Sequence, residues 1–568
     1  MRSALALAVF CACSRPDSGD PSAGEKHPAQ VVQGITTEEL LSGTVHRLDI
    51  HLSEAMMAEL AREPRDYVRG SVQLGERQLD EVGIRFKGHR SLRSWADKPA
   101  FKLNFGKYRK RQRLAGLRTL SLNNMVEDPT LLREQLAYRV FRALGAPAPH
   151  VGHAEVFVNG ERFGLYALVE PIDGPLLARS FDTKATVVYE GDYGCDVYPG
   201  DVWGMEMDEG DDPQRAHLGA LSRAASNPPM TLLEGDGALL HREHFFSFLA
   251  ASIWTGDFDG YRHGHNYRLY LDGGTGRWSL IPWGLDRALK RELGPYDIHG
   301  RLARACFADA TCRLEHVKTM HSALHKLAKL DLPALFDQLS AKIEAAASRD
   351  GRKPHGKKRR MKERAKLRAF ISSRSETLRG QLSCWDGSQE LDRDGDGFGC
   401  LDCNDEDPAV YPGAQERCGD GVDRDCSGHA DDTGACGCRE VTAEGARFAL
   451  CDFPRSWSEA AAFCRARGAV LAFLDSKRQA RALQALAEDV HEEDWWIGLN
   501  DRQKEGEARY VQSTSSFRYW ASGEPDDYAC GEDCAALKED AKGRFRDLHC
   551  ARPLPFVCRS DPPAPPGL

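Results

Sequence analysis

The chain has 568 residues, which is too long for a single hydrophobic core, so we expect about two to four domains. Its 76 basic and 85 acidic residues give a net charge of -9, which excludes a general electrostatic attraction to nucleic acid. Most of the 18 cysteines lie beyond residue 383. A disulfide-dense half is typical of proteins from an oxidising compartment.

The first 13 residues have the pattern of an export signal. Arg2 precedes a short apolar run at residues 4–12, and a polar linker rich in Pro, Gly, Asp and Ser follows over residues 14–37. Residues 10–13, Phe-Cys-Ala-Cys, form an imperfect lipobox, so we consider three alternatives: a lipid on Cys13, an ordinary secretory signal, or a start codon assigned too late. No later run has the ~20 apolar residues of a membrane span, so a lipid anchor is the only membrane attachment we expect.

Residues 38–383 show the mixed periodicity of an α/β region. Residues 44–52 alternate like a strand, whereas residues 131–144 carry apolar side chains at helical spacing before Gly145, a suitable C-cap. Residues 154–158 and 163–169 are apolar runs on either side of Asn159-Gly160, a pair that favours a type I′ turn. We therefore expect a hairpin in this part of the chain.

Several short motifs within this region occur in a specific order. They are residues 84–91 (IRFKGHRS), 98–105 (KPAFKLNF), 120–124 (LSLNN), 132–138 (LREQLAY), 156–160 (VFVNG), 164–166 (GLY), Glu170, 259–261 (DGY), 265–270 (HNYRLY) and 282–286 (PWGLD). In this order they resemble the CotH family of atypical protein kinases. The resemblance implies a kinase-like fold over residues 38–383 and ATP-dependent phosphoryl transfer to Ser or Thr of a protein substrate.

Phosphoryl transfer needs cations at the phosphates, a metal held by oxygen ligands, and a group that orients the nucleophile. By resemblance, Lys98 or Lys102 meets the phosphates of ATP, and Glu134 positions that lysine. Asp259 faces the acceptor hydroxyl, and nearby Asp257 is its alternative. The remaining two candidates, Asn266 and Asp286, carry the oxygen ligands that Mg²⁺, or Mn²⁺ in its place, prefers.

The chain departs from the CotH pattern at its metal segment. The family usually has Pro-Trp-Asp-x-Asp there, but this sequence has Gly284 in place of the first carboxylate. Either Asp286 alone suffices for the metal, or the region is a scaffold that binds nucleotide poorly.

Residues 351–368 are strongly basic. They form either a surface for nucleic acid or another polyanion, or the solvated face of a helix.

Residues 384–438 are rich in Asp, Gly and Cys. Asp392, Asp394 and Asp396 occupy positions one, three and five of a loop with Gly at six, which aims three carboxylates at one centre. Cys403 stands where an EF-hand needs Glu, so an EF-hand is excluded. Together with Asp402 and Asp405, the segment resembles the metal-binding repeat of MopE-type surface proteins.

This segment is too short to form a core of its own, so Ca²⁺ and disulfides would have to hold it. A disordered acidic linker is the alternative. The cysteines available for such disulfides are Cys384, Cys400, Cys403, Cys418, Cys426 and Cys436.

Residues 439–560 carry a Trp-bearing pattern and precede a Pro-rich tail at 561–568. Residues 495–501 (WWIGLND), 523–526 (GEPD) and 555–558 (PFVC) fall in this order between spaced cysteines, and together they resemble a C-type lectin-like domain. The resemblance implies three disulfides: Cys438–Cys451, Cys464–Cys558 and Cys534–Cys550. Cys530 is then left over.

The C-type lectin family binds calcium and sugar through oxygen ligands in this region. The resemblance assigns that role to Glu524, Asp526, Glu532 and Asp547, with Pro525 supplying a cis bond. Arg546 replaces the usual asparagine. A cation there would pair with Asp526 or Glu524 and take the place of the metal, so a protein-binding or structural role is the alternative.

Taken together, the sequence predicts a multidomain α+β protein that is exported to the cell surface or beyond. A CotH-like kinase region comes first, a calcium-stabilised spacer second, and a lectin-like region that binds a glycan or a protein third. Two further alternatives remain: a non-catalytic adhesion protein with a degenerate kinase-like scaffold, and an enzyme that transfers nucleotide rather than phosphate. We expect no nucleic-acid partner.

Overall fold

A computed structural model of the chain describes residues 35–382, 391–426 and 437–560. Within these ranges, 43, 89–90, 182–184, 192–194, 199–200, 397, 401, 412–413, 418–419, 421, 425, 491–493, 505, 512, 528–531, 539–540, 551 and 553 are not described. The predicted export signal, most of the linker, the tail, and Cys384, Cys418, Cys436 and Cys530 therefore lie outside the described residues. No helix in the described part is long and apolar enough to cross a membrane.

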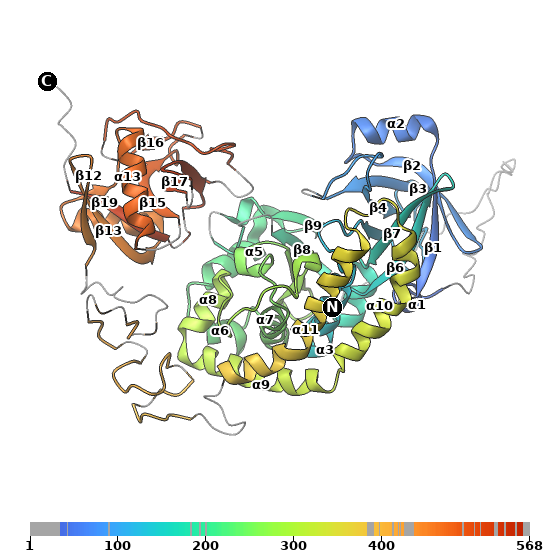
Figure 1. Cartoon of the computed structure of the whole chain (residues 1–568), viewed down its shortest axis with the longest axis horizontal. Coiled ribbons are helices and arrows are strands. Elements are labelled where there is room, and N and C mark those ends of the chain that lie inside the picture. Colours follow the sequence, from blue (N-terminus) through green and yellow to red (C-terminus); the bar gives the residue numbers. More distant parts are fainter. Residues whose placement is uncertain are drawn as a thin grey trace, which may run out of the picture. The chain divides into compact units, whose positions relative to one another are not determined.

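Seven strands near the N-terminus close into a barrel in the order β1-β2-β3-β4-β5-β7-β6 (blue to teal in Figure 1). Most neighbours are antiparallel, and the parallel pair β1 and β6 closes the ring. The strands are β1 (Val45–His51), β2 (Val68–Leu74), β3 (Arg77–Lys87), β4 (Ala100–Asn104), β5 (Thr119–Asn123), β6 (Val151–Val158) and β7 (Glu161–Val169). The short helices α1 (Thr37–Leu40) and α2 (Glu54–Arg62) flank β1.

Strand register gives the barrel wall an apolar side and a polar side. Phe101 pairs with Phe86 on one neighbour and with Leu122 on the other, and all three side chains are buried. The adjacent positions carry polar side chains, because successive residues of a strand point to opposite faces. The predicted hairpin is confirmed: Asn159 and Gly160 link β6 to β7 with φ angles of 50° and 84°.

A second, mainly helical part continues from the barrel. Its four-stranded sheet has the order β11-β10-β8-β9, from β8 (Ala185–Gly191), β9 (Glu206–Gly210), β10 (Tyr267–Asp272) and β11 (Trp278–Pro282). The predicted helix at 131–144 is present as α3 (Arg133–Leu144), which ends at Gly145 in the left-handed region. Other helices here are α4 (Gly174–Ser180), α5 (Ala216–Ala224), α6 (Pro229–Leu233), α8 (Arg301–Ala308) and α10 (Leu332–Arg349), with short 3-10 turns η1 (Asp201–Trp203), η2 (Pro213–Arg215), η3 (Tyr261–His263) and η4 (Leu285–Arg287).

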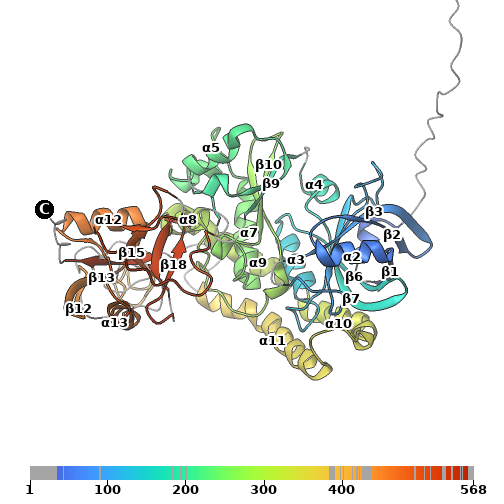
Figure 2. The same ribbon diagram turned by 90° about the horizontal axis from the view of Figure 1, so that it is seen from above.

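The core of this part surrounds α7 (Arg242–Thr255), which is buried along most of its length. It contacts α3, α9 (Ala310–Ala328) and the long α11 (Lys357–Gln381), and Figure 1 shows α7 nearly end-on among them. Figure 2 shows α11 running beside α10. This framework fixes α3, whose first turn carries the candidate site.

Helix α11 contains most of the basic stretch noted in the sequence, from Lys357 to Arg368. Lys357, Lys358 and Lys362 are exposed, but Arg360 and Arg364 are buried and both pair with Glu344 of α10, at 2.7 Å each. The segment is therefore a helix with one solvated face and one packed face, and part of its positive charge is already neutralised within the fold.

The last region, residues 437–560, forms one sheet in the order β12-β13-β19-β15-β17-β18, flanked by α12 and α13. The strand β14 pairs with β19 and β16 with β15. The bounds are β12 (Arg439–Ala443), β13 (Ala446–Arg455), α12 (Trp457–Ala466), β14 (Val470–Leu471), α13 (Lys477–Glu488), β15 (Trp495–Asn500), β16 (Arg509–Tyr510), β17 (Cys534–Leu537), β18 (Phe545–Leu548) and β19 (Leu554–Arg559).

Three disulfides cross-link this region. The structure joins Cys438 to Cys451, Cys464 to Cys558, and Cys534 to Cys550. These are the pairs that the lectin resemblance implies. The Cys464–Cys558 bond ties α12 to β19, and it closes a loop of 94 residues in sequence, which restricts the unfolded chain strongly.

Candidate functional site

A lysine, an amide and a carboxylate form a continuous chain of hydrogen bonds where two barrel strands end. Lys87, the last residue of β3, donates from Nζ to Oδ1 of Asn123 at 2.6 Å, and Asn123 is the last residue of β5. Nδ2 of Asn123 donates to both carboxylate oxygens of Glu134, at 3.0 and 2.8 Å. Glu134 is buried in the first turn of α3, so the barrel and the helix meet at this point.

Burial and opposite charge act against each other in this group. Burial lowers the pKa of Lys87 to about 8, and the negative charge of Glu134 limits the drop. Burial also raises the pKa of Glu134, against the hydrogen bond from Asn123 and the charge of Lys87. Lys87 also lies 5.5 Å from the ring centre of Trp283. The sequence motifs contained Lys87 and Asn123, but only the strand register shows that their ends meet Glu134.

The two lysines predicted from the sequence have different positions. Lys102 lies opposite Ser121 on the polar side of the barrel wall, where its charge acts on Lys87. Lys98 instead is buried in an ion pair with Asp350 at 2.7 Å, and its Nζ also donates to the Leu165 carbonyl at 2.6 Å. The structure thus places Lys98 in a tertiary anchor, and Glu134 positions Lys87 rather than Lys98.

Asp259 and Asn266 lie together beyond the C-terminus of α7. Nδ2 of Asn266 donates to the Asp259 carbonyl at 2.8 Å and approaches the Asp259 carboxylate at 3.5 Å. Arg287 forms an ion pair with that carboxylate at 3.3 Å. The alternative residue, Asp257, is buried with one carboxylate oxygen unpaired, and burial with the charge of Asp259 raises its pKa to about 8. Asp259 differs from Asp257 in being partly exposed.

Asp286 lies in η4, which packs against α3. Burial and the charges of Glu134, Asp128 and Asp259 raise the pKa of Asp286 well above its ordinary value. Among the described residues, no side-chain cation forms an ion pair with it. A divalent ion beside Asp286 would offset this crowded negative charge, so the residues present fit Mg²⁺ or Mn²⁺.

The glycine that departs from the family pattern has a conformational reason. Gly284 has φ 61°, and a Cβ atom built on it would lie 2.8 Å from Oδ1 of Asn266. A side chain at this position would therefore adopt a disfavoured backbone conformation and displace Asn266.

The Asp-rich segment holds its carboxylates in two overlapping groups. Oxygens of Asp392, Asp394 and Asp396 lie within 4.8 Å of one another, and so do those of Asp394, Asp402 and Asp405. Asp396 and Asp402 each accept a backbone N–H on one oxygen, from Phe398 at 2.8 Å and Asn404 at 2.9 Å. The other oxygen of Asp394, Asp396 and Asp402 is buried and has no hydrogen-bond partner.

Those unpaired oxygens support the interpretation of this segment as a metal site. Burial and the charges of Asp396, Asp394 and Asp405 raise the pKa of Asp402 to about 6, because backbone donation from Asn404 does not offset them. A hard cation with oxygen ligands would satisfy all three oxygens at once.

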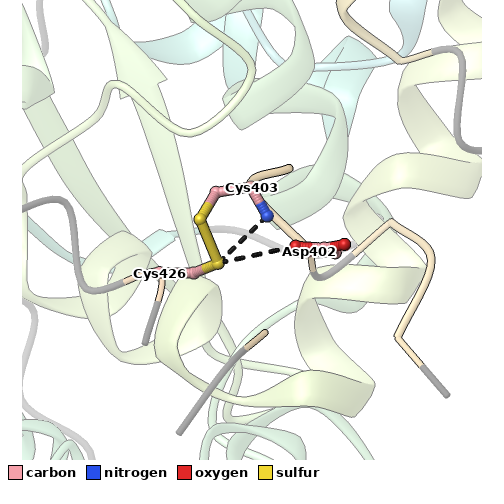
Figure 3. Close-up of side chains that lie close together, drawn as sticks. All are labelled: Asp402, Cys403 and Cys426. Atoms are coloured by element: carbon pink, nitrogen blue, oxygen red, sulfur yellow. Dashed lines mark hydrogen bonds between the residues drawn. A yellow bond between two sulfur atoms is a disulfide. The ribbon is translucent and has the colours of Figure 1, made fainter. Parts of the chain in front are cut away.

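A third group of metal-ligand residue types in this segment is not a metal site. Asp402 lies beside Cys403 and Cys426, but the two sulfurs are joined in a disulfide, as Figure 3 shows. Disulfide sulfur is not the thiolate that binds metal. The backbone N–H of Cys403 points to the Cys426 sulfur at 3.0 Å, so the disulfide holds the loop that carries Asp402.

In the last region, Glu524, Asp526 and Asp547 place carboxylate oxygens within 4.8 Å of one another. The Glu524–Pro525 bond is cis, and Asp547 on β18 accepts the backbone N–H of Asp526 at 3.1 Å. Glu532 is not part of this tight group. Burial and the charge of Asp547 raise the pKa of Glu532 to about 8.

The cation in contact with this group is not the one the sequence suggested. Arg546 turns away to form an ion pair with Asp494 at 3.2 Å, so the expectation that it pairs with Asp526 or Glu524 is wrong. Instead Lys538 donates from Nζ to Glu524 at 2.9 Å. No local pattern predicts this contact, because Lys538 follows β17 and reaches Glu524 only through the packing of a loop.

Further acidic residues that sequence reasoning missed lie next to this group. Asp501 accepts the Gly506 N–H at 3.1 Å, and burial raises its pKa, with Asp533 and Asp547 acting in the same direction. Asp527 accepts the backbone N–H of Glu532 at 2.9 Å. The carboxylates of this end of the region thus extend beyond the predicted four.

Comparison with known proteins gives the same order of regions. The sequence model of the CotH kinase protein family matches residues 84–378, which is more than half of the chain. Models of a metal-binding motif of the MopE type and of the lectin C-type domain match residues 402–432 and 453–560. The three resemblances and the multidomain α+β fold class predicted from the sequence are confirmed.

Individual relatives cover separate parts of the chain. It is 26% identical over 294 residues to the inner spore coat protein H of Bacillus subtilis (strain 168), a match that covers 47% of this chain and 79% of that protein. It is 32% identical over 111 residues to the hepatic lectin of Gallus gallus, covering 19% of this chain and 51% of the lectin, so the chain spans about half of that relative's length.

Among solved structures, the mouse scavenger receptor C-type lectin carbohydrate-recognition domain matches at 25% identity and a TM-score of 0.20, covering 22% of this chain and 99% of that one. The CotH match begins near the end of β3 and covers β4 to β7, α3 and the helical core, and it includes Lys87, Asn123 and Glu134. On that match, this chain belongs to the CotH kinase protein family.

Proposed function

We propose that this protein is an exported enzyme that transfers a phosphoryl group from ATP to Ser or Thr of a protein. The observation that carries the proposal is that Lys87 of β3, Asn123 of β5, Glu134 of α3 and Asp286 of η4 come together in one place. A lysine beside a crowded carboxylate group matches what nucleotide phosphates and a divalent ion require.

Each residue has a separate role in this proposal. Lys87, with Lys102 near it, binds the phosphates, and Glu134 orients Lys87 through Asn123. Asp286 and Asn266 hold the metal ion, which would neutralise charge on the phosphates when bound. Asp259 accepts the proton of the substrate hydroxyl. For this role its ion pair with Arg287 has to break, with the Arg287 guanidinium pairing with another negative group instead.

We propose domain limits of 38–383, 384–438 and 439–560 for the three functions. The middle domain is a calcium-stabilised spacer, with the unpaired oxygens of Asp394, Asp396 and Asp402 as its support. The last domain recognises a glycan or protein surface and addresses the enzyme to it. Its similarity to animal lectins and the export signal pattern support a location outside the cytoplasm, with a lipid on Cys13 as a further alternative.

A non-catalytic adhesion protein is the second candidate function. Two observations favour it: Gly284 supplies no carboxylate, and the carboxylate of Asp259 is already paired with Arg287. On this alternative, the CotH-like region is a scaffold and the lectin-like region carries the function.

The experiment that separates the two is the melting temperature of the full chain with ATP and Mg²⁺ or Mn²⁺. An active site predicts a shift that grows with nucleotide concentration and disappears in Lys87→Met and Asp286→Asn. The matched control is Lys362→Met on α11, an exposed lysine that should leave the shift unchanged. No shift in the unmodified chain would favour the scaffold. Label from γ-labelled ATP in a protein indicates a kinase, and label from α-labelled ATP indicates nucleotide transfer.

A further inference from the structure

We propose that Lys538 is a built-in competitor of calcium in the lectin-like region, and that calcium binds there only when the Lys538 ammonium leaves Glu524. This inference rests on the proposed recognition function of the last domain and on the calcium-binding role that the lectin resemblance assigns to Glu524, Asp526 and Asp547. It assigns a new role to a residue outside the predicted ligand set, as a determinant of the calcium concentration at which the site loads.

The first support is the position of the ammonium group. Its nitrogen lies 2.9 Å from Oε1 of Glu524, and Glu524 belongs to the group whose oxygens lie within 4.8 Å of one another. Calcium takes about six to eight oxygen ligands at roughly 2.3–2.6 Å. An ion bound by all three carboxylates would need the Glu524 oxygens, so the ammonium and the ion compete for the same carboxylate.

The second support is how firmly the backbone holds Lys538 in this place. The residue follows β17, its N–H donates to the Arg544 carbonyl at 2.9 Å, and its own carbonyl accepts from Gln484 at 2.7 Å. The loop that carries Glu524 is fixed against β18 by two backbone bonds between Phe545 and residues 519 and 521, both 2.8 Å. The two backbones are therefore held close together, and only the side chains are left to make or break the contact.

The third support is the contrast in burial within the pair. The Glu524 side chain is 11% exposed, whereas that of Lys538 is 33% exposed. A lysine has a flexible four-carbon stem, and its charged end readily returns to water. The Lys538 side chain can therefore swing out into solvent, whereas the Glu524 side chain stays in place. This makes the competition between the ammonium and calcium reversible.

Arg546 shows that the effect is specific to one cation. It lies on the neighbouring strand opposite Ala536, yet its guanidinium forms its ion pair with Asp494 rather than with Glu524 or Asp526. The residue that departs from the family pattern in sequence is therefore not the one that occupies the site in space.

The test is calcium titration of the full chain by calorimetry. All variants carry Asp394→Asn, because Asp394 belongs to both carboxylate groups of the Asp-rich segment and would add its own heat. Lys538→Met should bind calcium at least tenfold more tightly than the parent. Lys542→Met is the matched control: it removes the same charge from an exposed position that has no ion pair among the described residues, and should stay within twofold of the parent.

Each result decides something. Equal affinity in the parent and in Lys538→Met overturns the competition but leaves the calcium function standing. Equal tightening in both lysine variants assigns the effect to net charge and also overturns it. Absence of calcium binding in every variant overturns both the competition and the calcium-binding role of the Glu524, Asp526 and Asp547 group. Lys538→Gln is the second variant if Lys538→Met fails to fold by circular dichroism, with the same expected gain.

Discussion

Lys87 and Lys98 show how the surroundings of a side chain decide its role. Lys98 is almost fully enclosed and neutralised by Asp350, itself inaccessible to solvent, so both charges serve the fold. Lys87 is half-buried, and its hydrogen bond goes to Asn123, which in turn bonds to Glu134. An ammonium group has three hydrogens, so this arrangement leaves donors for a ligand. Both lysines lie in motifs typical of the family, and the phosphate-binding role that we propose for Lys87 depends on this difference.

The two lysines should therefore respond in opposite ways to the same substitution. We expect Lys98→Met to lower the free energy of unfolding by about 3 kcal/mol, because it leaves Asp350 buried without a partner. Lys87→Met should leave stability unchanged or raise it, since it removes a partly desolvated charge. Urea unfolding measures both. Adding Asp350→Asn to Lys98→Met should recover part of the loss, and a Lys98→Met protein as stable as the parent would contradict the anchor role.

Gly284 is a residue where backbone geometry outweighs chemistry. Restoring the family carboxylate by Gly284→Asp should not create a better metal site, because the φ of 61° and the contact with Asn266 both oppose a side chain. We expect Gly284→Asp and Gly284→Ala to lose about 1–2 kcal/mol of unfolding free energy each. Chemical unfolding checks this. A stable Gly284→Asp protein with a larger ATP–Mg²⁺ melting shift would show that the glycine is a lost ligand after all.

At the scale of elements, α11 connects parts of the fold through buried guanidinium groups. Arg374 is inaccessible to solvent, and it donates to the Ile253 carbonyl at 2.7 Å, the Leu293 carbonyl at 2.6 Å and the Trp254 carbonyl at 3.2 Å. The Ile253 and Trp254 carbonyls belong to the last turn of α7. The guanidinium therefore places a positive charge at the C-terminus of that helix, where the helix dipole favours one.

We expect Arg374→Met to destabilise the CotH-like region by about 3 kcal/mol, because three carbonyls each lose a hydrogen bond from a buried charged donor. Arg374→Lys should recover only part of this, since a single ammonium does not match the planar fork. The matched control is Arg379→Met at the exposed end of α11, where the one ion pair that this arginine forms with a described residue is to Glu376. Thermal melting followed by tryptophan fluorescence compares them, and equal effects of both Met variants would contradict this role.

At the scale of the whole molecule, acid stability depends on histidines that the fold keeps neutral. Burial lowers the pKa of both His153 and His316 to about 4, and each bonds to a backbone carbonyl, Leu131 and Pro295. Between pH 6.5 and 4 the unfolded chain therefore binds more protons than the folded one. The free energy of unfolding falls as pH drops through this window.

The expected slope is about 1.4 kcal/mol per pH unit for each histidine inside that window. His316→Gln should be less stable at pH 7 but should lose less stability between pH 6.5 and 4.5 than the parent. Unfolding by urea at a series of pH values tests this. His321→Gln, at a less buried histidine on the same helix, is the control, and an equal change of slope there would show that burial of His316 is not the cause.

The sequence by itself determined the order of the three regions and the fold class, because each depends on local patterns. Ordered motifs, cysteine spacing and the Asn159–Gly160 turn all act over short distances along the chain. It also named Glu134, Asp259, Asn266 and Asp286, which carry charges or amides that phosphoryl transfer needs.

Only the tertiary structure decided which side chains meet. Lys87 rather than Lys98 joins Glu134, because β3 and β5 end at the same edge of the barrel wall. Lys538 rather than Arg546 contacts the lectin-like carboxylates, because a loop packs along β18 and brings Glu524 to the end of β17. A side chain's partner depends on register and packing between segments distant in sequence, and no local pattern records either of them.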